Sequence, residues 1–374
     1  MRSPHLYDTL RRFCLGAFAV FHGADLPFAF EEHAPSFYEY RPLVKGFIES
    51  QADRLRVRED VKEALEDLAR EPATAVYTDV YRTLLVPLLV RTAEGCGGFD
   101  WDDSAFDRAY AEFEETLFGE QHTYAALAPL VGLGCGAAIE LGDGIRVRQA
   151  VTGELAALWP ESAGLLPRDF GREVGRTCLL ELERALEKGA DEVPDAPGEL
   201  ADAVTALRLA TAAPVAAGPV LFERLDWRPY GIRPALPIAA TAPPGEATRL
   251  DPFRASVAAR LRPQLVIADE DVQLGEALDR WELALFQDEP FRGEQLRHAL
   301  HSALGGDDGA WAAAMRAAAL LGEVDVECFR TPSADLVRRL LIVVLEHGSR
   351  ARLLSELDGA MLGRHARVQE LRAS

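Results

Sequence analysis

The chain has 374 residues, which is too long for one ordinary hydrophobic core, so we expect two or three domains. Hydrophobic residues make up 48% of the chain and charged residues 27%, a balance that is typical of globular proteins and excludes an intrinsically disordered chain. The formal net charge of −20 excludes a nucleic-acid-binding surface spread over the whole protein and leaves room only for a local basic patch.

Residues 1–118 are predicted to be helical. Leu6–Phe21 places its apolar side chains on one face, as expected for a helix that packs on a core. Phe37–Ala69 has the same periodicity with an interruption near Pro42, so we expect it to be mostly helical as well.

Two further helices are expected before residue 118. Thr74–Ala93 is apolar on most sides, and its helix must either kink at Pro87 or end before it. Ser104 is the expected N-cap of the next helix, because its hydroxyl can accept a hydrogen bond from a free backbone N–H of the first turn.

The middle of the chain, residues 119–250, is predicted to be a mixed α/β module with a proline-rich loop. Alternation in AAIEL and in IRVRQ, joined by the three-residue loop Gly142-Asp143-Gly144, predicts a β-hairpin. Pro219–Trp227 is a second extended segment. We expect a short helix from Thr152 to Leu158 and a longer one over Gly171–Lys188.

Residues 251–374 are predicted to form a C-terminal helical bundle, because short turns join successive helical segments. Its centre is expected at Val337–Leu345, which is apolar on nearly all sides. The expected helices are Phe253–Leu261, Glu270–Phe286, Gly293–Leu304, Gly309–Leu321, Ala334–His347 and Arg350–Ala373. The fold class is therefore mainly α, α+β overall: a helical N-terminal region, a small hairpin-containing middle module and a helical bundle.

The location of the protein follows from its cysteines and its apolar segments. The five cysteines are odd in number and far apart, so the sequence has neither a disulfide framework nor a CxxC metal motif. Arg11 and Arg12 precede a short apolar run, which we interpret as a core-facing helix and not as a signal peptide. No apolar stretch reaches the roughly 20 residues that span a bilayer. We expect a cytoplasmic protein without a membrane partner.

Glycines in the middle of the chain are dense enough to cradle a phosphate. Gly132, Gly134 and Ala137 fit the relaxed dinucleotide fingerprint, which needs a helix directly after it. Too few residues precede the next turn for that helix, so we expect these glycines to form turns. The sequence also has no P-loop lysine, HExxH zinc motif, GxSxG nucleophile elbow or kinase signature. We predict no cofactor.

Two weaker patterns lie on one predicted helix. Glu294, His298 and His301 share a face, and a carboxylate with two imidazoles can hold a divalent metal, although the sequence indicates no further ligand. Arg292 precedes His298 by six residues. In a metal-independent ribonuclease the histidine would act on the ribose 2′-hydroxyl, and the arginine would stabilise the phosphorane. About two such spacings are expected by chance in a chain this rich in arginine, so the spacing alone identifies no active site.

Several segments of the middle and C-terminal parts carry a resemblance. They are APLVGL (Ala128–Leu133), IELGDGIRVRQAVTGE (Ile139–Glu154), MRAAALLG (Met315–Gly322), DLVRRLLIVVLE (Asp335–Glu346) and ELDGAML (Glu356–Leu362). In these segments the chain resembles the ApeA-like anti-phage proteins, prokaryotic proteins with a β-containing N-terminal module and a C-terminal HEPN-type helical bundle. The resemblance implies a HEPN-type bundle and a role in prokaryotic stress or anti-phage defence.

The catalytic segment of that group is not matched. Its members carry an arginine-serine…histidine-glycine segment in the helix after the RAAALLG-like one. Here EVDVECFRTPSADLV occupies that place and contains no histidine, while His347 follows Arg339 with seven residues between them. The resemblance therefore implies an inactive bundle, or it is only the likeness of one helical bundle to another.

The sequence thus predicts a non-catalytic binding protein whose partner is a protein, a nucleotide or RNA, with a homodimer as one option. Two alternatives stay open. One is a HEPN-like metal-independent ribonuclease in which Arg292 and His298 meet the same pair across a dimer. The other is a metal-dependent hydrolase centred on Glu294, His298 and His301.

Overall fold

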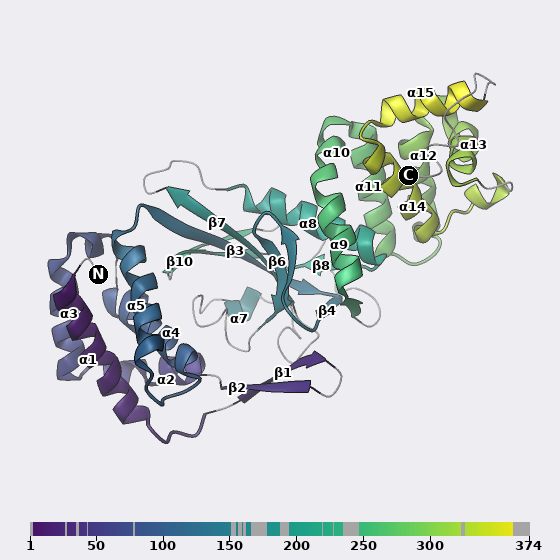
Figure 1. Cartoon of the computed structure of the whole chain (residues 1–374). Coiled ribbons are helices and arrows are strands. Elements are labelled where there is room, and N and C mark those ends of the chain that lie inside the picture. The colour runs from purple at the N-terminus through teal and green to yellow at the C-terminus, as the bar shows by residue number, and fades with distance from the viewer. Residues whose placement is uncertain are drawn as a thin grey trace. The chain divides into compact units, whose positions relative to one another are not determined.

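The fold is mainly helical with an added β-sheet, which confirms the predicted fold class (Figure 1). The structure is a computed structural model, and it describes residues 3–26, 28–34, 37–42, 44–77, 79–150, 155, 159, 162–165, 178–187, 194–218, 220–226, 228–234, 247–322 and 326–361. Among these residues no helix is both long and apolar enough to cross a membrane.

The chain forms two compact units. Unit 1 contains Met1–Pro129, Arg148–Ala196 and Val220–Ala235, and unit 2 contains Leu130–Val147, Pro197–Pro219 and Leu236–Ser374. The predicted helical region 1–118 belongs wholly to unit 1 and the predicted bundle 251–374 wholly to unit 2, whereas residues 119–250 contribute to both. The division into three domains stays a prediction.

The N-terminal helices of unit 1 surround one apolar core. Buried apolar residues of α1 recur at spacings of three and four residues, so one face of the helix lies inward, and the predicted helix Leu6–Phe21 is confirmed. The helices are α1 (Pro4–Phe21), α2 (Val44–Leu55), α3 (Glu59–Arg70), the 3₁₀ turn η1 (Pro72–Val76), the π-helical turn η2 (Tyr81–Leu85), α4 (Val86–Cys96) and α5 (Asp103–Phe118).

The prediction of helix over Phe37–Ala69 is wrong at its start. Phe37–Pro42 is strand β2, which pairs antiparallel with β1 (Phe28–Ala34). The segment FYEYRP is rich in aromatic residues, which favour strands, and Pro42 biases the residue before it toward extended backbone. The rest of the prediction is confirmed by α2 and α3.

Pro87 is accommodated by a change of helix type. A proline inside a helix removes one N–H, and its ring clashes with the carbonyl four residues earlier. The π-helical turn Tyr81–Leu85 lies directly before α4 and widens the helix at that place, so Pro87 falls in the first turn of α4. The sequence left open a kink at Pro87 or a helix end before it; the structure has a π-helical turn followed directly by α4 instead.

The N-cap of α5 is Asp102, and the prediction of Ser104 is wrong. The carboxylate of Asp102 accepts the backbone N–H of Ser104 at 2.9 Å and also the Ser104 hydroxyl at 2.8 Å. The serine hydroxyl donates to the cap and does not itself cap the helix. These bonds, the hydroxyl bond first, lower the pKa of Asp102.

We expect Asp102→Ala to destabilise unit 1 more than Ser104→Ala does. Its loss of unfolding free energy should be at least about twice as large. The aspartate change removes the acceptor of the first-turn N–H, whereas the serine change leaves that acceptor in place. Urea denaturation of both variants checks the order. Equal losses would contradict the assignment of the cap.

Strands of the large sheet follow the order β10-β9-β3-β7-β6-β5, with β8 beside β3, while β11 and β4 form a separate parallel pair. Their bounds are β3 (Gln121–Val131), β4 (Leu133–Cys135), β5 (Ile139–Gly142), β6 (Ile145–Gln149), β7 (Cys178–Glu187), β8 (Ala216–Ala217), β9 (Val220–Leu225), β10 (Arg228–Pro234) and β11 (Thr248–Leu250). β9 confirms the predicted extended segment. The register of β3 and β9 sets Tyr124 opposite Leu225 and Leu127 opposite Phe222.

The helix predicted over Gly171–Lys188 is wrong for Cys178–Glu187, which is strand β7. Leucine, glutamate, arginine and alanine favour helix locally, but β7 lies between β3 and β6 in the sheet, and that non-local pairing overrides the preference. The remaining residues of that prediction lie outside the described residues, as does the short helix predicted at Thr152–Leu158 apart from Leu155.

The predicted hairpin is confirmed as β5 and β6. Ile139 pairs with Val147, and Gly142 pairs with Ile145, so the loop itself is only Asp143-Gly144. Gly142, Asp143 and Gly144 all have positive φ, between 46° and 87°, which glycine adopts without strain and aspartate tolerates. The glycines therefore serve a tight turn, as the sequence predicts.

Helices dominate unit 2. α14 is their centre, as predicted, because it contacts α9, α11, α12, α13 and α15 and buries Val337, Leu340, Leu341, Val344 and Leu345. The predicted helices are confirmed, the last of them as far as Met361, where the described residues end. The bounds are α8 (Ala196–Thr211), α9 (Pro252–Leu261), η4 (Arg262–Gln264), α10 (Val266–Glu270), α11 (Val272–Leu285), α12 (Phe291–Leu304), η5 (Gly306–Asp308), α13 (Gly309–Leu321), η6 (Val326–Phe329), α14 (Ala334–His347) and α15 (Arg350–Met361); α7 (Ser162–Leu165) belongs to unit 1.

Two buried arginines tie the helices of unit 2 together. Arg208 of α8 donates to Glu282 of α11 at 2.5 Å, and Thr205 donates to the other oxygen of the same carboxylate at 2.5 Å. Arg316 of α13 donates to the carbonyl of Leu304 at 2.8 Å and pairs with Asp358 of α15 at 2.7 Å. Each guanidinium is paired with a carboxylate of unit 2, Arg208 with Glu282 and Arg316 with Asp358.

Candidate functional site

The residues of the predicted ribonuclease pair both lie on α12 and are exposed. Positions six apart on an α-helix differ by roughly 120° around its axis and about 9 Å along it. Arg292 and His298 therefore leave α12 in different directions, and α12 alone does not bring them to one phosphate. The ribonuclease assignment stays a prediction.

The predicted metal ligands share the outward face of α12. His298 Nε2 lies 3.9 Å from Glu294 Oε1, and both side chains are more than half exposed. His301 is half-buried one turn further on. Within the ranges that the structure describes, no three histidine, cysteine, aspartate or glutamate side chains lie close enough to hold a metal ion.

His347, the displaced histidine of the resemblance, lies at the C-terminal end of α14. Its Nδ1 is 3.1 Å from the carbonyl oxygen of Ser349, and its Nε2 is 3.3 Å from Glu356 of α15. Arg352 first and His347 second lower the pKa of Glu356. The imidazole thus contacts the turn between α14 and α15 and a side chain of α15, and it holds the two helices together.

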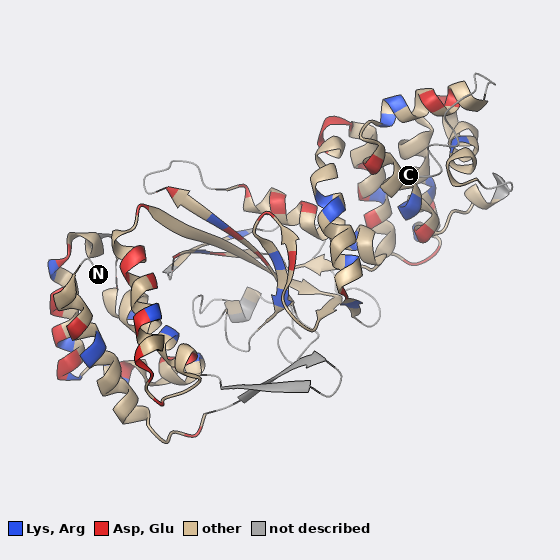
Figure 2. Ribbon diagram, in the orientation of Figure 1, with Lys and Arg blue, Asp and Glu red and all other residues tan. Residues whose placement is uncertain are grey.

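The outward side of α13 is apolar and uncharged. Trp311 is 64% exposed and Met315 is 37% exposed, and their spacing of four residues places them on one edge of the helix. The single charged residue of α13 is Arg316, which is buried, and the helix is tan over most of its length in Figure 2. We call Trp311 and Met315, with the alanines around them, the α13 surface.

Other large apolar side chains of unit 2 are also exposed, on separate helices. The large apolar side chains that are exposed in the helical part of unit 2 are Phe253, Val266, Val272, Phe291, Trp311, Met315 and Met361. Scattered exposed leucines or valines need no explanation, but an exposed tryptophan on an uncharged helix face is typical of protein interfaces.

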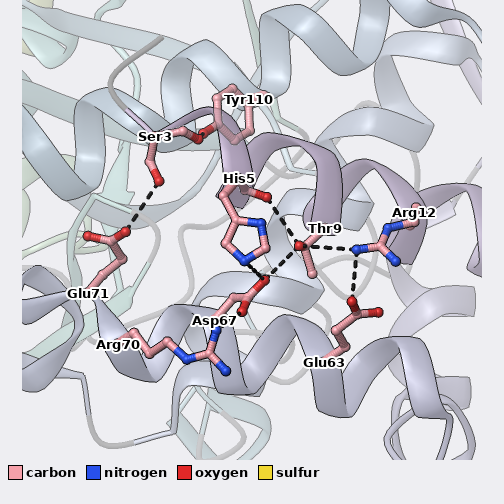
Figure 3. A network of polar contacts seen from close by, with 9 residues as sticks. All are labelled: Ser3, His5, Thr9, Arg12, Glu63, Asp67, Arg70, Glu71 and Tyr110. Atoms are coloured by element: carbon pink, nitrogen blue, oxygen red, sulfur yellow. Dashed lines mark hydrogen bonds and ion pairs between the residues drawn. The ribbon is translucent and has the colours of Figure 1, made fainter.

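In unit 1 a polar network joins α1 to α3 (Figure 3). The buried carboxylate of Asp67 accepts the hydroxyl of Thr9 at 2.7 Å, the imidazole of His5 at 3.1 Å and the guanidinium of Arg70 at 2.8 Å. A hydroxyl, an imidazole and a carboxylate thus meet, yet Thr9 is buried and its hydroxyl donates to the carboxylate directly. The network holds the two helices together.

The large sheet carries a histidine–aspartate pair in unit 1. His122 Nδ1 lies 2.7 Å from the buried Asp226 Oδ2, and the backbone N–H of Thr123 donates to Asp226 Oδ1 at 2.8 Å. Because a carboxylate only accepts, Nδ1 is the donor in this pair. Asp226 has a positive φ of 54°, which is rare for a residue other than glycine. The pair orients one imidazole; a reaction there would also require a nucleophile or a bound substrate.

Two glutamates are buried in the same sheet. Glu181 of β7 lies between Arg148 of β6, at 2.6 Å, and Arg224 of β9, at 3.3 Å. Glu223 of β9 accepts the hydroxyl of Tyr124 and the guanidinium of Arg233, the latter at 2.8 Å. Each buried carboxylate is therefore matched by a donor from another strand, as the cost of burying an isolated charge requires.

Tyr124 keeps its proton throughout the ordinary pH range. Burial first, and its hydrogen bond to Glu223 second, raise the pKa of its hydroxyl. The ring of Tyr230 meets the ring of Tyr124 edge to face at 6.4 Å. This tyrosine–glutamate–arginine chain is a satisfied network inside the sheet and positions no group for proton transfer at neutral pH.

Sequence reasoning missed these sheet residues, although a signal for two of them is present. Glu181 lies within the apolar run CLLELE, and Glu223 lies within VLFERL. A glutamate inside a buried strand must find a partner, so such a run indicates an internal ion pair. The partners themselves lie far away in the sequence and follow only from the strand order.

Comparisons with known proteins give no relative: no family model, no curated protein and no solved structure matches the chain. The HEPN-type assignment therefore stays a prediction that rests on the sequence segments that carry it.

Proposed function

We propose that this chain is a non-catalytic interaction protein that binds a protein partner through the α13 surface. The observation that carries the proposal is the exposure of Trp311 beside Met315 on a helix face without charge. Tryptophan at the centre of an apolar patch contributes more to protein binding than most residue types. Two anchors four residues apart match the way in which one helix edge enters an apolar groove.

The same surface favours a protein over a nucleic acid. Binding to phosphates depends on exposed lysine and arginine, which also makes it sensitive to salt. The outward side of α13 offers neither, because its one arginine is buried against Asp358 and the Leu304 carbonyl. A protein surface with an apolar groove is the complementary partner.

The proposed setting is the cytoplasm of a prokaryotic cell, within a stress or anti-phage system. None of the five cysteines, all of which lie in the described residues, forms a disulfide, which is consistent with a reducing compartment. The resemblance of the middle and C-terminal segments to the ApeA-like proteins supports the system. Neither argument depends on the α13 surface.

The proposal is tested by comparing Trp311→Glu with Val57→Glu in cells of the source organism. Val57 is 74% exposed in unit 1, so its change adds the same charge at an exposed apolar position elsewhere. We expect the partner that copurifies with wild type to be kept by Val57→Glu and lost by Trp311→Glu. With the purified partner, the dissociation constant should rise at least about 30-fold for Trp311→Glu.

Two results would contradict the proposal. One is equal partner binding by wild type and Trp311→Glu. The other is cleavage of RNA by the purified chain that disappears in His298→Ala, which would establish the ribonuclease alternative. Light scattering on wild type distinguishes a second copy of this chain from another protein as the partner, since only self-association doubles the mass of the pure sample.

A further inference from the structure

His347, at the C-terminal end of α14, has a hydrogen-bond acceptor beside each nitrogen of its ring. Nδ1 lies 3.1 Å from the carbonyl oxygen of Ser349, and Nε2 lies 3.3 Å from the carboxylate of Glu356 on α15. The side chain of His347 is only 13% exposed, so water has little room to replace either partner. A neutral imidazole carries one N–H and can donate to only one of the two oxygens, whereas an imidazolium donates to both. The geometry therefore fits the protonated form.

This arrangement distinguishes His347 from other histidines that lie beside a carboxylate. His5, His22, His122 and His298 each place one ring nitrogen near an aspartate or a glutamate. In the part of the chain that the structure describes, the other nitrogen of these four rings has no acceptor within hydrogen-bond distance. One N–H satisfies each of them, so only His347 needs the second proton.

The charges nearest to His347 also favour its proton. The residue closes α14, where the helix dipole is negative. The carboxylate of Glu356 accepts Arg352 at 2.9 Å as well as the imidazole, and these two partners, Arg352 first, lower the pKa of Glu356, so it is ionised at neutral pH. Among the described residues no carboxylate of α9, α11, α12 or α13 pairs with this imidazole, so Glu356 is its counter-ion.

The other charged groups of this corner are engaged elsewhere. Glu346, directly before His347, pairs with Arg260 of α9. Arg350, at the start of α15, is buried and donates to the carbonyls of Ser302 and Ala303 at the end of α12. Neither arginine takes the place of the imidazole at Glu356.

Loss of the ring's second proton breaks one of the two contacts. The nitrogen without hydrogen then faces an oxygen lone pair at hydrogen-bond distance, which repels it. Either the bond to Glu356 or the bond to the turn at Ser349 is lost, and both bonds join α14 to α15. Leu353 and Leu357 of α15 are buried and stay in the core, so α15 loosens without unfolding the unit.

We infer that His347, with Ser349 and Glu356, is a pH-sensitive latch that holds α15 on α14 when the imidazole is protonated and loosens α15 when it is neutral. Protonation favours the closed latch, so its contribution to stability is present at acidic pH. That contribution is lost as the pH rises through the range in which histidines lose their proton, about pH 5 to 8. The latch lies within unit 2 and does not depend on a partner at the α13 surface.

The test uses the full chain at pH 6 and at pH 8, which lie on either side of the ordinary histidine titration. Nitrogen-15 NMR of the histidine rings shows whether one or both ring nitrogens carry a proton, and His347→Gln assigns the resonances by their disappearance. Hydrogen exchange followed by mass spectrometry, corrected for the intrinsic exchange rate at each pH, measures the protection of the amides in α15. The matched control is His298→Gln, because His298 also lies beside a glutamate but is exposed on α12.

We expect both ring nitrogens of His347 to be protonated at pH 6 and only one at pH 8. The protection of α15 should fall about 10-fold between these values, as expected for the loss of one hydrogen bond to a charged group. This fall should disappear in His347→Gln, whose amide does not titrate, and should persist in His298→Gln. If His347→Gln does not fold, Glu356→Gln, which removes the ionised acceptor, should show a smaller fall than wild type.

Three results would overturn the inference. The first is a His347 ring with only one protonated nitrogen at pH 6, which means that the two acceptors do not hold an imidazolium. The second is equal protection of α15 at the two pH values. The third is a fall in protection that persists in His347→Gln, which assigns the pH dependence to another group.

Discussion

Replacing Arg208 by methionine is expected to remove about 3–5 kcal/mol from the unfolding free energy of unit 2. The guanidinium of Arg208 is buried against Glu282, which is itself buried, and it also donates to the carbonyl of Val215 at 2.7 Å. Without the arginine, an ionised carboxylate stays in the core with only Thr205 as a donor. Urea denaturation followed by circular dichroism measures the loss.

The loss in Arg208→Met should depend on pH. Burial raises the pKa of Glu282 and is the largest influence on it, while Arg208 and Thr205 lower the pKa. Removing Arg208 raises the folded-state pKa further above the unfolded value of about 4.3. Between the unfolded-state pKa and the folded-state pKa of Glu282, the folded variant binds a proton that the unfolded chain does not. The variant therefore loses stability as the pH rises through this range.

We therefore expect the deficit of Arg208→Met to be larger at pH 8 than at pH 5. The control is the double variant Arg208→Met/Glu282→Leu, which removes both charges and should recover most of the stability. A deficit that does not change with pH, or a double variant as unstable as the single one, would show that the pair does not carry the effect.

The second large effect is expected for Arg316→Met, at about 2–4 kcal/mol. Arg316 donates to the Leu304 carbonyl at the end of α12 and pairs with Asp308 at 2.5 Å and Asp358 at 2.7 Å. Its bond to Asp358 is the first cause of the raised pKa of its guanidinium, so it is charged at every accessible pH. Methionine fills the space but leaves the buried carbonyl without a donor.

Hydrogen exchange in α15 should also rise in Arg316→Met, because Asp358 belongs to that helix. Arg352→Met is the matched control: Arg352 pairs with Glu356 four residues away on the exposed side of α15. It should cost at most about 0.5 kcal/mol. Equal effects of the two variants would mean that burial of Arg316 is not what stabilises the unit.

The helices of unit 2 could be predicted from the sequence because their signals are local. α14 has apolar residues at helical spacing, Ser333 as an N-cap that accepts the backbone N–H of Leu336, and Gly348 with positive φ after its end. Those signals lie within a single segment of the chain. The same holds for the hairpin β5–β6, whose turn residues are adjacent.

Strands β3 and β7 could not be predicted in the same way. β3 is buried on both sides through most of its length, so the alternation that marks a strand is absent. β7 consists largely of residues that favour helix, and it is a strand because β3 and β6 flank it. The sequence predictions contain no element at α8, whose Pro197 lies in the first helical turn, where proline is common.

The same difference between local and non-local signals decides which candidate-site residues could be predicted. The exposure of Trp311 could not be inferred from the sequence, since an apolar alanine-rich helix is expected to lie inside a bundle. The buried pairs of Glu181 and Glu223 depend on the strand order of the sheet, which is assembled from distant segments. The predicted residues of α12, by contrast, are where the helical pattern places them.

The most direct test of the central claim is photo-crosslinking from position 311 in cells of the source organism. A benzophenone amino acid replaces Trp311 in one sample and Val57 in a matched sample, and the adducts are identified by mass spectrometry. The account predicts one major protein adduct from position 311 that is absent from position 57. RNA as the main adduct, or the same adducts from both positions, would contradict it.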